Sequence, residues 1–210
     1  MLRDGRPVLI RQVQRTDAAL LADGFAQLSV QSRRSRFLIA KNHLSPPELC
    51  HCVDVDHHDH EAIGAVSLGD GHGVGIARYV RSTDDPMAAE IAVTVIDAWQ
   101  GRGLGTQLLA HLSERARHEG IHRFTALLSA DNTAALALLR NTDVEAQVVD
   151  RDGDTVELEI TLTAYRCALC GTPAGIGSSV VSHEGRWICD ACIRENIPRV
   201  VAELAQPWWQ

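Results

Sequence analysis

A glycine-rich loop, QGRGLGT, begins at Gln100 and separates two segments with different hydrophobic periods. Residues 87–96 before it read as a strand, residues 103–119 after it as an amphipathic helix, and residues 122–128 as the next strand. Glycine lets backbone N–H groups turn toward an anion, and a helix N-terminus adds partial positive charge. The loop therefore predicts a crossover with a pyrophosphate site at its turn. The helix leucines expected to face inward are Leu104, Leu108, Leu109 and Leu112.

The elements around this loop argue against a dinucleotide-binding Rossmann unit. That unit would need its first strand at the loop, an acidic residue about 20 positions later, and parallel strands on both sides. Here four strands are predicted before the loop, and the glycine spacing differs. We predict an α/β (α+β) protein whose mixed, mostly antiparallel sheet is flanked by helices. The other expected elements are a strand at 7–13, helices at 16–29, 45–53 and 132–141, and hairpins formed by 61–68 with 74–81 and by 146–149 with 156–162.

Length and composition allow one ordinary core and a small appendage. The chain has 210 residues, of which 45% are hydrophobic, and a formal net charge of -7. We expect a main domain at residues 1–163 and a small one at 164–210. No broad positive field is evident, so nucleic acid is not an expected partner. Because neither an export leader nor an apolar run of roughly 20 residues is seen, we expect a cytoplasmic protein without membrane contact.

Gln100, Gly103 and Gly105 fit the pattern Gln/Arg-x-x-Gly-x-Gly/Ala, and together with the order of elements they make the chain resemble the GNAT superfamily of N-acetyltransferases. The resemblance implies acetyl-CoA as co-substrate and a GNAT fold, in which the fourth strand splays from the next in a V. In that family the pantetheine lies in the V, the loop holds the pyrophosphate, and an Asn opening the following helix reaches the CoA arm. Asn at that place is also a common helix cap. The positions implied for coenzyme binding are Val93, Thr94, Val95, Gln100, Gly101, Arg102, Gly103, Leu104, Gly105, Thr106 and Asn132.

Glu90 is the expected catalytic residue. Acetyl transfer needs a deprotonated amine, and a carboxylate on the strand that carries the acetyl group can take the ammonium proton directly or through one water. The segments beginning at Gly75, Ala89 and Trp99 resemble the catalytic domain of actinobacterial Pat-type protein lysine acetyltransferases, in which the glutamate at the position of Glu90 is the base. Their control by cyclic nucleotide is not implied here. Alternatively, Glu90 is a strand carboxylate that pairs with Arg78.

The chain departs from the family pattern at two places. Leu139 stands where many GNAT enzymes have a tyrosine that protonates the leaving thiolate, and Asp143 and Val144 replace a glycine-aromatic pair. A CoA thiolate is a tolerable leaving group at neutral pH, so we expect activity without the tyrosine. Backbone N–H groups near Val95 are expected to stabilise the oxyanion.

Three functions fit these residues. The first, favoured by the Pat-type resemblance, is acetylation of a protein lysine, and the second is acetylation of a small-molecule amine. The third is a non-catalytic acyl-CoA-binding adaptor, in which Glu90 has no catalytic role and the C-terminal segment carries the function.

Cysteine and histidine cluster between Cys50 and His60. A metal site is conceivable there, but the residues fall near a short helix end and on a polar turn, without evident ligand geometry, so a polar turn is the preferred interpretation. His60 also matches a histidine of the Pat-type enzymes, so a position of His60 near the substrate is the alternative interpretation.

Two CxxC pairs near the C-terminus predict a structural Zn²⁺ site. In a reducing compartment four closely paired cysteines indicate metal rather than disulfides, and about 45 residues have too little core to fold unaided. The segment resembles the N-terminal zinc-binding domain of the ClpX unfoldase, a treble-clef-like module that dimerises and docks adaptors. A homodimer or adaptor contact is therefore one expectation, and packing of this apolar segment on the main domain is the other. The expected metal ligands are Cys167, Cys170, Cys189 and Cys192.

Overall fold

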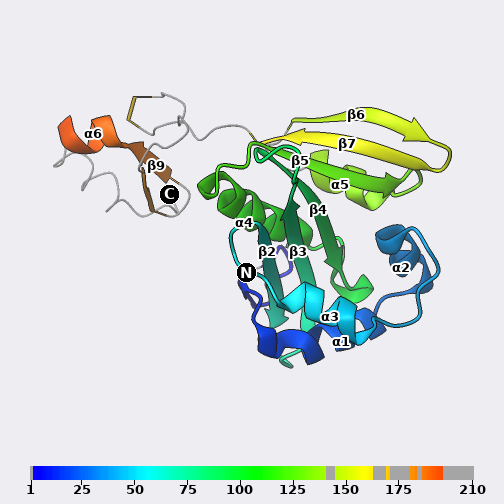
Figure 1. Ribbon diagram of the computed structural model, residues 1–210. Coiled ribbons are helices and arrows are strands. Elements are labelled where there is room, and N and C mark those ends of the chain that lie inside the picture. Colours follow the sequence, from blue (N-terminus) through cyan, green and yellow to red (C-terminus); the bar gives the residue numbers. More distant parts are fainter. Residues whose placement is uncertain (1, 141–144, 163–168, 171–179, 184–185, 196–210) are drawn as a thin grey trace. The chain divides into compact units, whose positions relative to one another are not determined.

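A computed structural model describes residues 2–140, 145–162, 169–170, 180–183 and 186–195. The chain divides into two compact units, Met1–Leu162 and Thr163–Gln210. The larger unit is built on a seven-stranded sheet in the order β1-β2-β3-β4-β5-β7-β6 (Figure 1). The strands are β1 Val8–Gln12, β2 His60–Ser67, β3 Gly73–Arg81, β4 Ala88–Val95, β5 Arg123–Ser129, β6 Glu145–Asp152 and β7 Thr155–Thr161.

All neighbouring strands run antiparallel except β4 and β5, which are parallel. The predicted mixed, mostly antiparallel sheet is confirmed. Five α-helices accompany the sheet in the described part of this unit, and two short 3-10 turns join them. The α-helices are α1 Ala18–Ala26, α2 Val30–Phe37, α3 Pro46–Val53, α4 Leu104–His118 and α5 Thr133–Arg140, and the 3-10 turns are η1 Arg15–Asp17 and η2 Asp97–Trp99.

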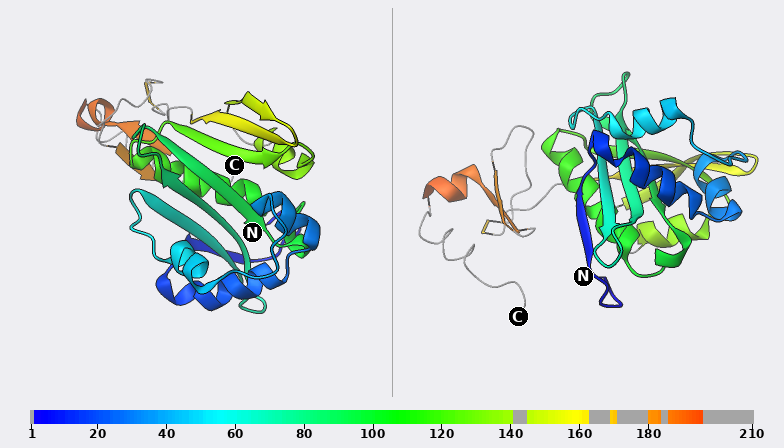
Figure 2. Two further views of the ribbon diagram at one scale, coloured as in Figure 1. Left: turned by 45° about the vertical axis from the view of Figure 1, so that its right-hand side comes forward. Right: turned by 90° about the horizontal axis from the view of Figure 1, so that it is seen from below.

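The helices lie on both faces of the sheet. In Figure 1, α1 and α3 stand in front of β2 and β3, and α4 lies behind these strands. A Cβ added at Gly75 of β3 would lie 2.9 Å from Leu108 Cδ1, so α4 packs directly on this strand. The leucines predicted to face inward are buried as expected: Leu104, Leu108, Leu109 and Leu112. Figure 2 gives two further views of this arrangement.

The predicted helix at 16–29 is confirmed as α1, which ends about three residues earlier than expected, at Ala26. A separate helix that was not predicted, α2, follows with Ser29 as its N-cap. The Ser29 side chain accepts a bond from the N–H of Ser32, and its own N–H and hydroxyl bond to the Asp97 carboxylate. Because α2 is polar and shows no apolar period, its sequence carried no helix signal of the usual kind. The predicted strand at 146–149 is likewise too short, since β6 spans eight residues.

In the smaller unit, β8 Val180–His183 pairs antiparallel with β9 Arg186–Cys189, and α6 Asp190–Glu195 follows directly. Ile188 and Cys192 are buried. Within the described residues, no helix of the chain is both long and apolar enough to cross a bilayer.

Glu61, on β2, is a fully buried carboxylate that ties β1, the turn before β2, and α4 together. It accepts hydrogen bonds from Gln12 Nε2 at 2.8 Å and Arg115 Nε at 3.0 Å, and lies 2.7 Å from His57 Nδ1. Burial raises the pKa of Glu61, but the hydrogen bonds from His57, Gln12 and Arg115 outweigh it and leave that pKa below its ordinary value. The ionised form is therefore the one that the fold stabilises.

We expect Glu61→Ala to lower the free energy of unfolding by about 3 kcal/mol at pH 7, because it leaves the partners of a buried charge unpaired. A depressed folded-state pKa gives stability above the unfolded-state value, near 4.5, that disappears as pH falls through the folded-state pKa. The difference in the free energy of unfolding between Glu61→Ala and wild type should therefore become smaller at acidic pH. Urea unfolding followed by circular dichroism from pH 7 to pH 3 measures it.

The control is Glu157→Ala, an exposed position on β7, which should change stability by no more than about 0.5 kcal/mol. A Glu61→Ala deficit that stays constant down to pH 3 would contradict this role of the carboxylate.

Candidate active site

The parallel pairing between β4 and β5 stops at Glu90. Its register runs only from Ala88 opposite Arg123 to Glu90 opposite Thr125, whereas β4 remains paired with β3 as far as Val95. Beyond Glu90 the two strands diverge (Figure 1). This is the V predicted from the sequence, and Glu90 lies at its vertex.

The main chain of β4 presents alternate residues to this opening. The N–H of Ile96 donates to the Val74 carbonyl on the β3 side, and the direction of N–H and C=O alternates along a strand. The backbone groups of Ile91, Val93 and Val95 therefore point away from β3 and into the V. One of them, the Val95 carbonyl, accepts a bond from Gln100 Nε2 at 3.0 Å. Unpaired strand backbone facing a cavity can bind an amide-bearing chain in the way a further strand would.

A cavity of about 690 Å³ occupies this opening, bounded by β4, the glycine-rich loop, the start of α4, α5 and part of α2. Every coenzyme-binding position expected from the sequence lines it, except Arg102. The expected residues found in its wall are Val93, Thr94, Val95, Gln100, Gly101, Gly103, Leu104, Gly105, Thr106 and Asn132.

The loop brings a helix N-terminus to this cavity. Gly101 has φ +71° and Gly103, the N-cap of α4, has φ +86°, a backbone region in which only glycine is unstrained. No side chain caps α4. The first helical bond joins Gln107 N–H to the Gly103 carbonyl, so the N–H groups of Leu104, Gly105 and Thr106 have no intrahelical acceptor. Such a helix start binds phosphate groups.

Arg102 turns away from the cavity. Its Nε donates to the Ala98 carbonyl at 3.0 Å, and its guanidinium forms an ion pair with Asp4. Its carbonyl accepts a bond from the Arg3 N–H at 3.2 Å. These contacts tie the outer side of the loop to the N-terminal segment, and the Arg102 side chain does not reach the cavity.

Residues 23–142 match the family model described as the acetyltransferase (GNAT) family. The chain belongs to this family. It is an acetyl-CoA-dependent N-acetyltransferase. Acetyltransferase PA5475 of Pseudomonas aeruginosa is 34% identical over 160 residues, which cover 71% of this chain and 86% of that protein.

Acetyltransferase Pat of Mycolicibacterium smegmatis is 33% identical over 129 residues, which cover 61% of this chain and 37% of Pat. Among solved structures, the GNAT domain of S. lividans PAT superposes with a TM-score of 0.70 at 29% sequence identity. That superposition covers 75% of this chain and 92% of the solved one. The Pat-type resemblance of the GNAT unit is therefore confirmed.

Asn132 and Leu139 lie on the α5 side of the cavity of about 690 Å³. The Asn132 Oδ1 accepts a bond from the Ala135 N–H at 3.0 Å, so this residue caps α5 and also lines the cavity. Leu139, which stands at the position of the tyrosine of many GNAT enzymes, is 9% exposed and lines the cavity. Among the described residues that line the cavity there is no tyrosine, cysteine or histidine. The described wall therefore offers none of these three side chains as an acid for the leaving thiolate.

Glu90 is exposed on the face of β4 that carries Ala92 and Thr94. Its expected alternative partner, Arg78, is on the same face of β3 but forms no salt bridge with it, and instead donates through Nη1 to Cys52 Sγ at 3.5 Å. The charge of Glu90 does interact with that of Arg36, on α2. Burial and the neighbouring charge of Arg78 lower the pKa of Arg36 to about 10, partly offset by Cys52 and Glu90. The guanidinium thus remains charged at neutral pH.

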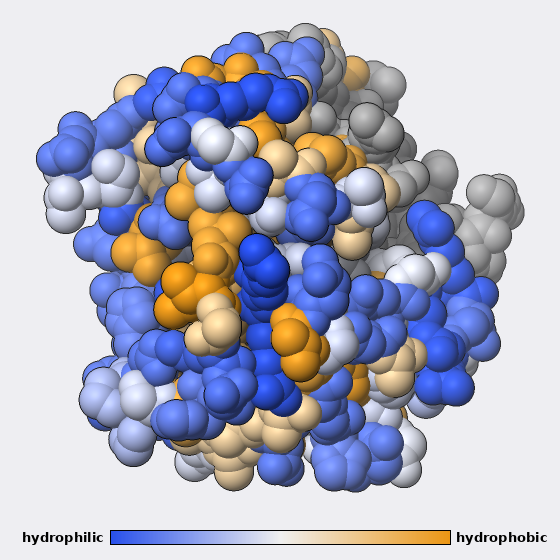
Figure 3. Space-filling model, turned by 90° about the vertical axis from the view of Figure 1, so that its right-hand side faces the viewer, coloured by the Kyte–Doolittle hydropathy of each residue, from blue (hydrophilic) through white to orange (hydrophobic). Residues whose placement is uncertain are grey.

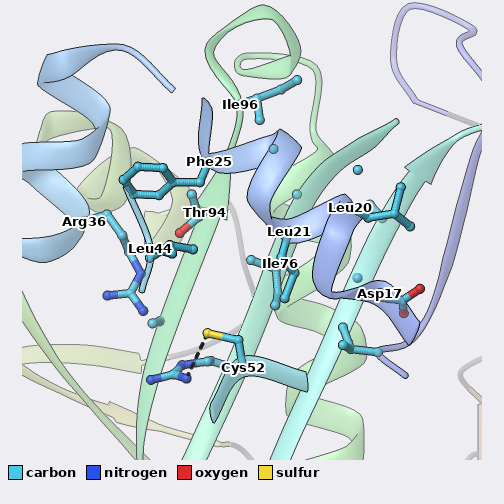
Figure 4. Close-up of a pocket in the computed structure, with 18 of the residues that line it drawn as sticks. Asp17, Leu20, Leu21, Phe25, Arg36, Leu44, Cys52, Ile76, Thr94 and Ile96 are labelled. Atoms are coloured by element: carbon cyan, nitrogen blue, oxygen red, sulfur yellow. Dashed lines mark hydrogen bonds between the residues drawn. The ribbon is translucent and has the colours of Figure 1, made fainter. Parts of the chain in front are cut away.

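A second cavity, of about 460 Å³, lies between the sheet and helices α1, α2 and α3. We call it the inner cavity and the first one the coenzyme cavity. Figure 4 shows Leu20, Leu21 and Phe25 of α1 around it, together with Leu44 and Ile76. The two cavities adjoin each other, because four residues form part of both walls. These shared residues are Arg36, Phe37, Ala92 and Thr94.

Arg36 and Phe37 were not predicted as site residues, because they lie on helix α2, which the sequence did not predict. The Ser29 N-cap was the only available sign of that helix. Figure 3 looks onto the side of the molecule where α2 and α5 lie in Figure 1 and shows a band of apolar side chains among polar ones.

In the cluster from Cys50 to His60, Cys50 and Cys52 lie in the last turns of α3, and His57 and His58 lie on the polar turn before β2. The Nδ1 atom of His57 is bonded to Glu61, and that of His58 to Glu119, so both rings are held by carboxylates of the larger unit. Nowhere in the described ranges do three or more His, Cys, Asp or Glu side chains gather as a possible metal site. His60 stacks on His51 with ring centroids 4.9 Å apart and lines neither cavity.

The expected zinc ligands fall partly outside the described residues. Cys167 is not described. Cys189 ends β9, and Cys192 is buried in the first turn of α6, so the second CxxC pair spans a strand end and a helix start. The four-cysteine site remains a prediction.

We expect Gly103→Ala to weaken CoA binding. A side chain at φ +86° costs about 1 kcal/mol, and relief of that strain moves the amides of the helix start, so the Kd for CoA should rise roughly fivefold or more. Isothermal titration calorimetry measures it.

Gly153→Ala is the matched control, with φ +53° in the β6–β7 hairpin and nothing within 4 Å of the added Cβ. It carries similar backbone strain away from the cavity and should leave the Kd unchanged. Equal effects of the two variants on CoA affinity would show that the loop amides do not hold the coenzyme.

Proposed function

We propose that the chain transfers the acetyl group of acetyl-CoA to a primary amine with Glu90 as general base. The observation that carries this proposal is the position of Glu90 at the vertex of the V, where it lines the coenzyme cavity on the strand that also lines the inner cavity. Val93, Val95 and the loop from Gly101 to Thr106 are proposed to bind the coenzyme through their main chain.

The reaction balances with these groups alone. Glu90 takes a proton from the acceptor ammonium, directly or through water, and the neutral nitrogen attacks the thioester carbonyl carbon. The N–C bond forms, the C–S bond breaks, and the nitrogen releases its second proton to solvent. CoA leaves as a thiolate that takes a proton from solvent. The N–H groups of β4 that point into the V support the developing oxyanion.

A lysine side chain of a protein is the acceptor that the similarity to Pat supports. The match to Pat covers the part of the chain that holds β4, the loop and α4. A small-molecule amine is a second candidate, and it is supported by a different observation. The inner cavity lies beneath α1 and α3 and has the size of small-ligand sites, which run from about 300 to 1,000 Å³.

We expect Glu90→Gln to lower kcat by about 100-fold or more, with little change in the KM for acetyl-CoA, because the amide keeps the shape but cannot take a proton. Release of CoA thiol in the presence of lysine-bearing proteins and of small amines measures it. Glu157→Gln, at an exposed strand carboxylate that lines neither cavity, is the control and should keep full activity. An unchanged rate in Glu90→Gln would exclude Glu90 as the base, and binding of acetyl-CoA without transfer to any amine would favour the adaptor function.

We also propose a structural Zn²⁺ in the smaller unit, bound by Cys167, Cys170, Cys189 and Cys192, with a role in partner binding or dimerisation. A strand end followed by a helix start, as at Cys189 and Cys192, suits a pair of thiolate ligands. Bound zinc would hold the two CxxC pairs together.

Native mass spectrometry should find one zinc ion per chain, absent from Cys170→Ser and retained by Cys50→Ser, a cysteine of the larger unit. The same spectra report dimers. Retention of zinc by Cys170→Ser would contradict the proposed ligand set.

A further inference from the structure

Two half-buried guanidinium groups lie where the coenzyme cavity and the inner cavity meet. Arg36 lines both cavities, and Arg78 lines the inner one. Their charges are near enough to repel each other. Arg36 stacks over the Phe37 ring with its Cζ 4.9 Å from the centroid, and Arg78 donates to the Cys52 sulfur. Figure 4 shows Arg36 and Cys52 on the same side of the inner cavity.

Neither guanidinium forms a salt bridge within the described residues, unlike other arginines on or beside the sheet. Arg11 pairs with Asp17, and Arg115 with Glu61. The carboxylates that line the inner cavity are already bound, since Asp17 is held by Arg11 and Glu48 by Lys41. The junction therefore carries two positive charges and, within reach of Arg36, the single negative charge of Glu90.

This imbalance favours an anionic ligand. Unpaired charges that are half-buried cost free energy, and a carboxylate between two guanidinium groups would recover it through charge-assisted hydrogen bonds. Glu90 cannot serve as that partner during the reaction, because its carboxylate then faces the ammonium group of the acceptor.

The rest of the inner cavity favours an apolar group. Its wall beyond the junction consists largely of aliphatic and aromatic side chains on α1, the segment before α3, and the sheet. Those that enclose it most directly are Leu20, Leu21, Phe25, Leu28, Leu44 and Ile76.

We infer that the acceptor is a free amino acid, or a close analogue, with an apolar side chain. Its carboxylate lies between Arg36 and Arg78, its side chain fills the inner cavity, and its α-amine reaches Glu90. The inference rests on the proposed acetyl transfer and names the acceptor of that same site. The products are the N-acetyl amino acid and CoA, formed by the bond exchange already described. The α-amine and the carboxylate of an amino acid are attached to the same carbon. Because the charges of Arg36 and Glu90 interact, Arg36 is near enough to bind the carboxylate while Glu90 takes the proton of the α-amine.

The first test compares acceptors that differ only in the carboxylate. CoA thiol release is measured with L-leucine, L-leucinamide and 3-methylbutylamine. We expect kcat/KM for L-leucine to exceed that for both others by about tenfold or more, since a hydrogen bond to a charged group is worth about 1.5–3 kcal/mol. The amide loses its ammonium proton more readily than leucine does, so intrinsic reactivity favours the opposite order. A preference for the amide, or acetylation of lysine-bearing proteins without any acetylation of leucine, overturns the inference while the proposed function stands.

The second test removes the guanidinium groups. Arg78→Met and Arg36→Met should each raise the KM for L-leucine by about 10- to 100-fold. Arg78→Met, at a residue that does not line the coenzyme cavity, should also leave kcat/KM for 3-methylbutylamine within about threefold. Arg34→Met, an exposed arginine of α2 that lines neither cavity, is the control and should change neither value. Equal losses with both acceptors would mean that the arginines hold the fold or the coenzyme, and would overturn the anion subsite.

A binding measurement separates this inference from the proposed function. L-leucine is titrated calorimetrically into acetyl-CoA-loaded Glu90→Gln and into the double variant that also carries Arg78→Met. Binding that is lost in the double variant supports the subsite even if no amine is ever acetylated, in which case only the proposed function fails. Equal binding in both overturns the subsite.

Discussion

Beyond Glu90 the parallel ladder between β4 and β5 ends, and the chemistry of the molecule depends on this interruption. If the pairing continued, the backbone groups of Val93 and Val95 would be used within the sheet, and no cavity could form beside them. Because β4 keeps its antiparallel pairing with β3 as far as Val95, the strand remains part of the sheet while one of its edges is open. The opening is stable because α4 and α5 pack at its sides and complete the wall.

The same interruption places three functional groups around one cavity. The α4 N-terminus approaches from the loop, the open edge of β4 runs along the cavity, and Glu90 is at the vertex. Two of these are backbone features, which explains why few polar side chains are needed in the coenzyme cavity. Leu139 in its wall is consistent with this, because a thiolate can leave without an acid from the protein.

Charge is distributed unevenly over the sheet. Glu61 is surrounded by donors, and Asp17 is bound by Arg11, so the charged groups near β1 and β2 are satisfied. Arg36 and Arg78 are not, and they lie next to the base. Two guanidinium groups that form no salt bridge with any described residue and lie beside a largely apolar cavity suit an anionic ligand.

Local patterns in the sequence determined the crossover, the inward leucines of α4, the glycine positions of the loop, and the place of Glu90 on β4. These follow from residues that are neighbours in the chain, because a glycine at positive φ and a helical period express themselves within a few residues. Only the tertiary structure decided that the polar helix α2 exists, that it carries Arg36 and Phe37 to the junction of two cavities, and that Arg78 bonds to Cys52 rather than to Glu90. Such contacts join segments that are far apart in the chain, and packing, which no local pattern encodes, selects among the partners that their charges allow.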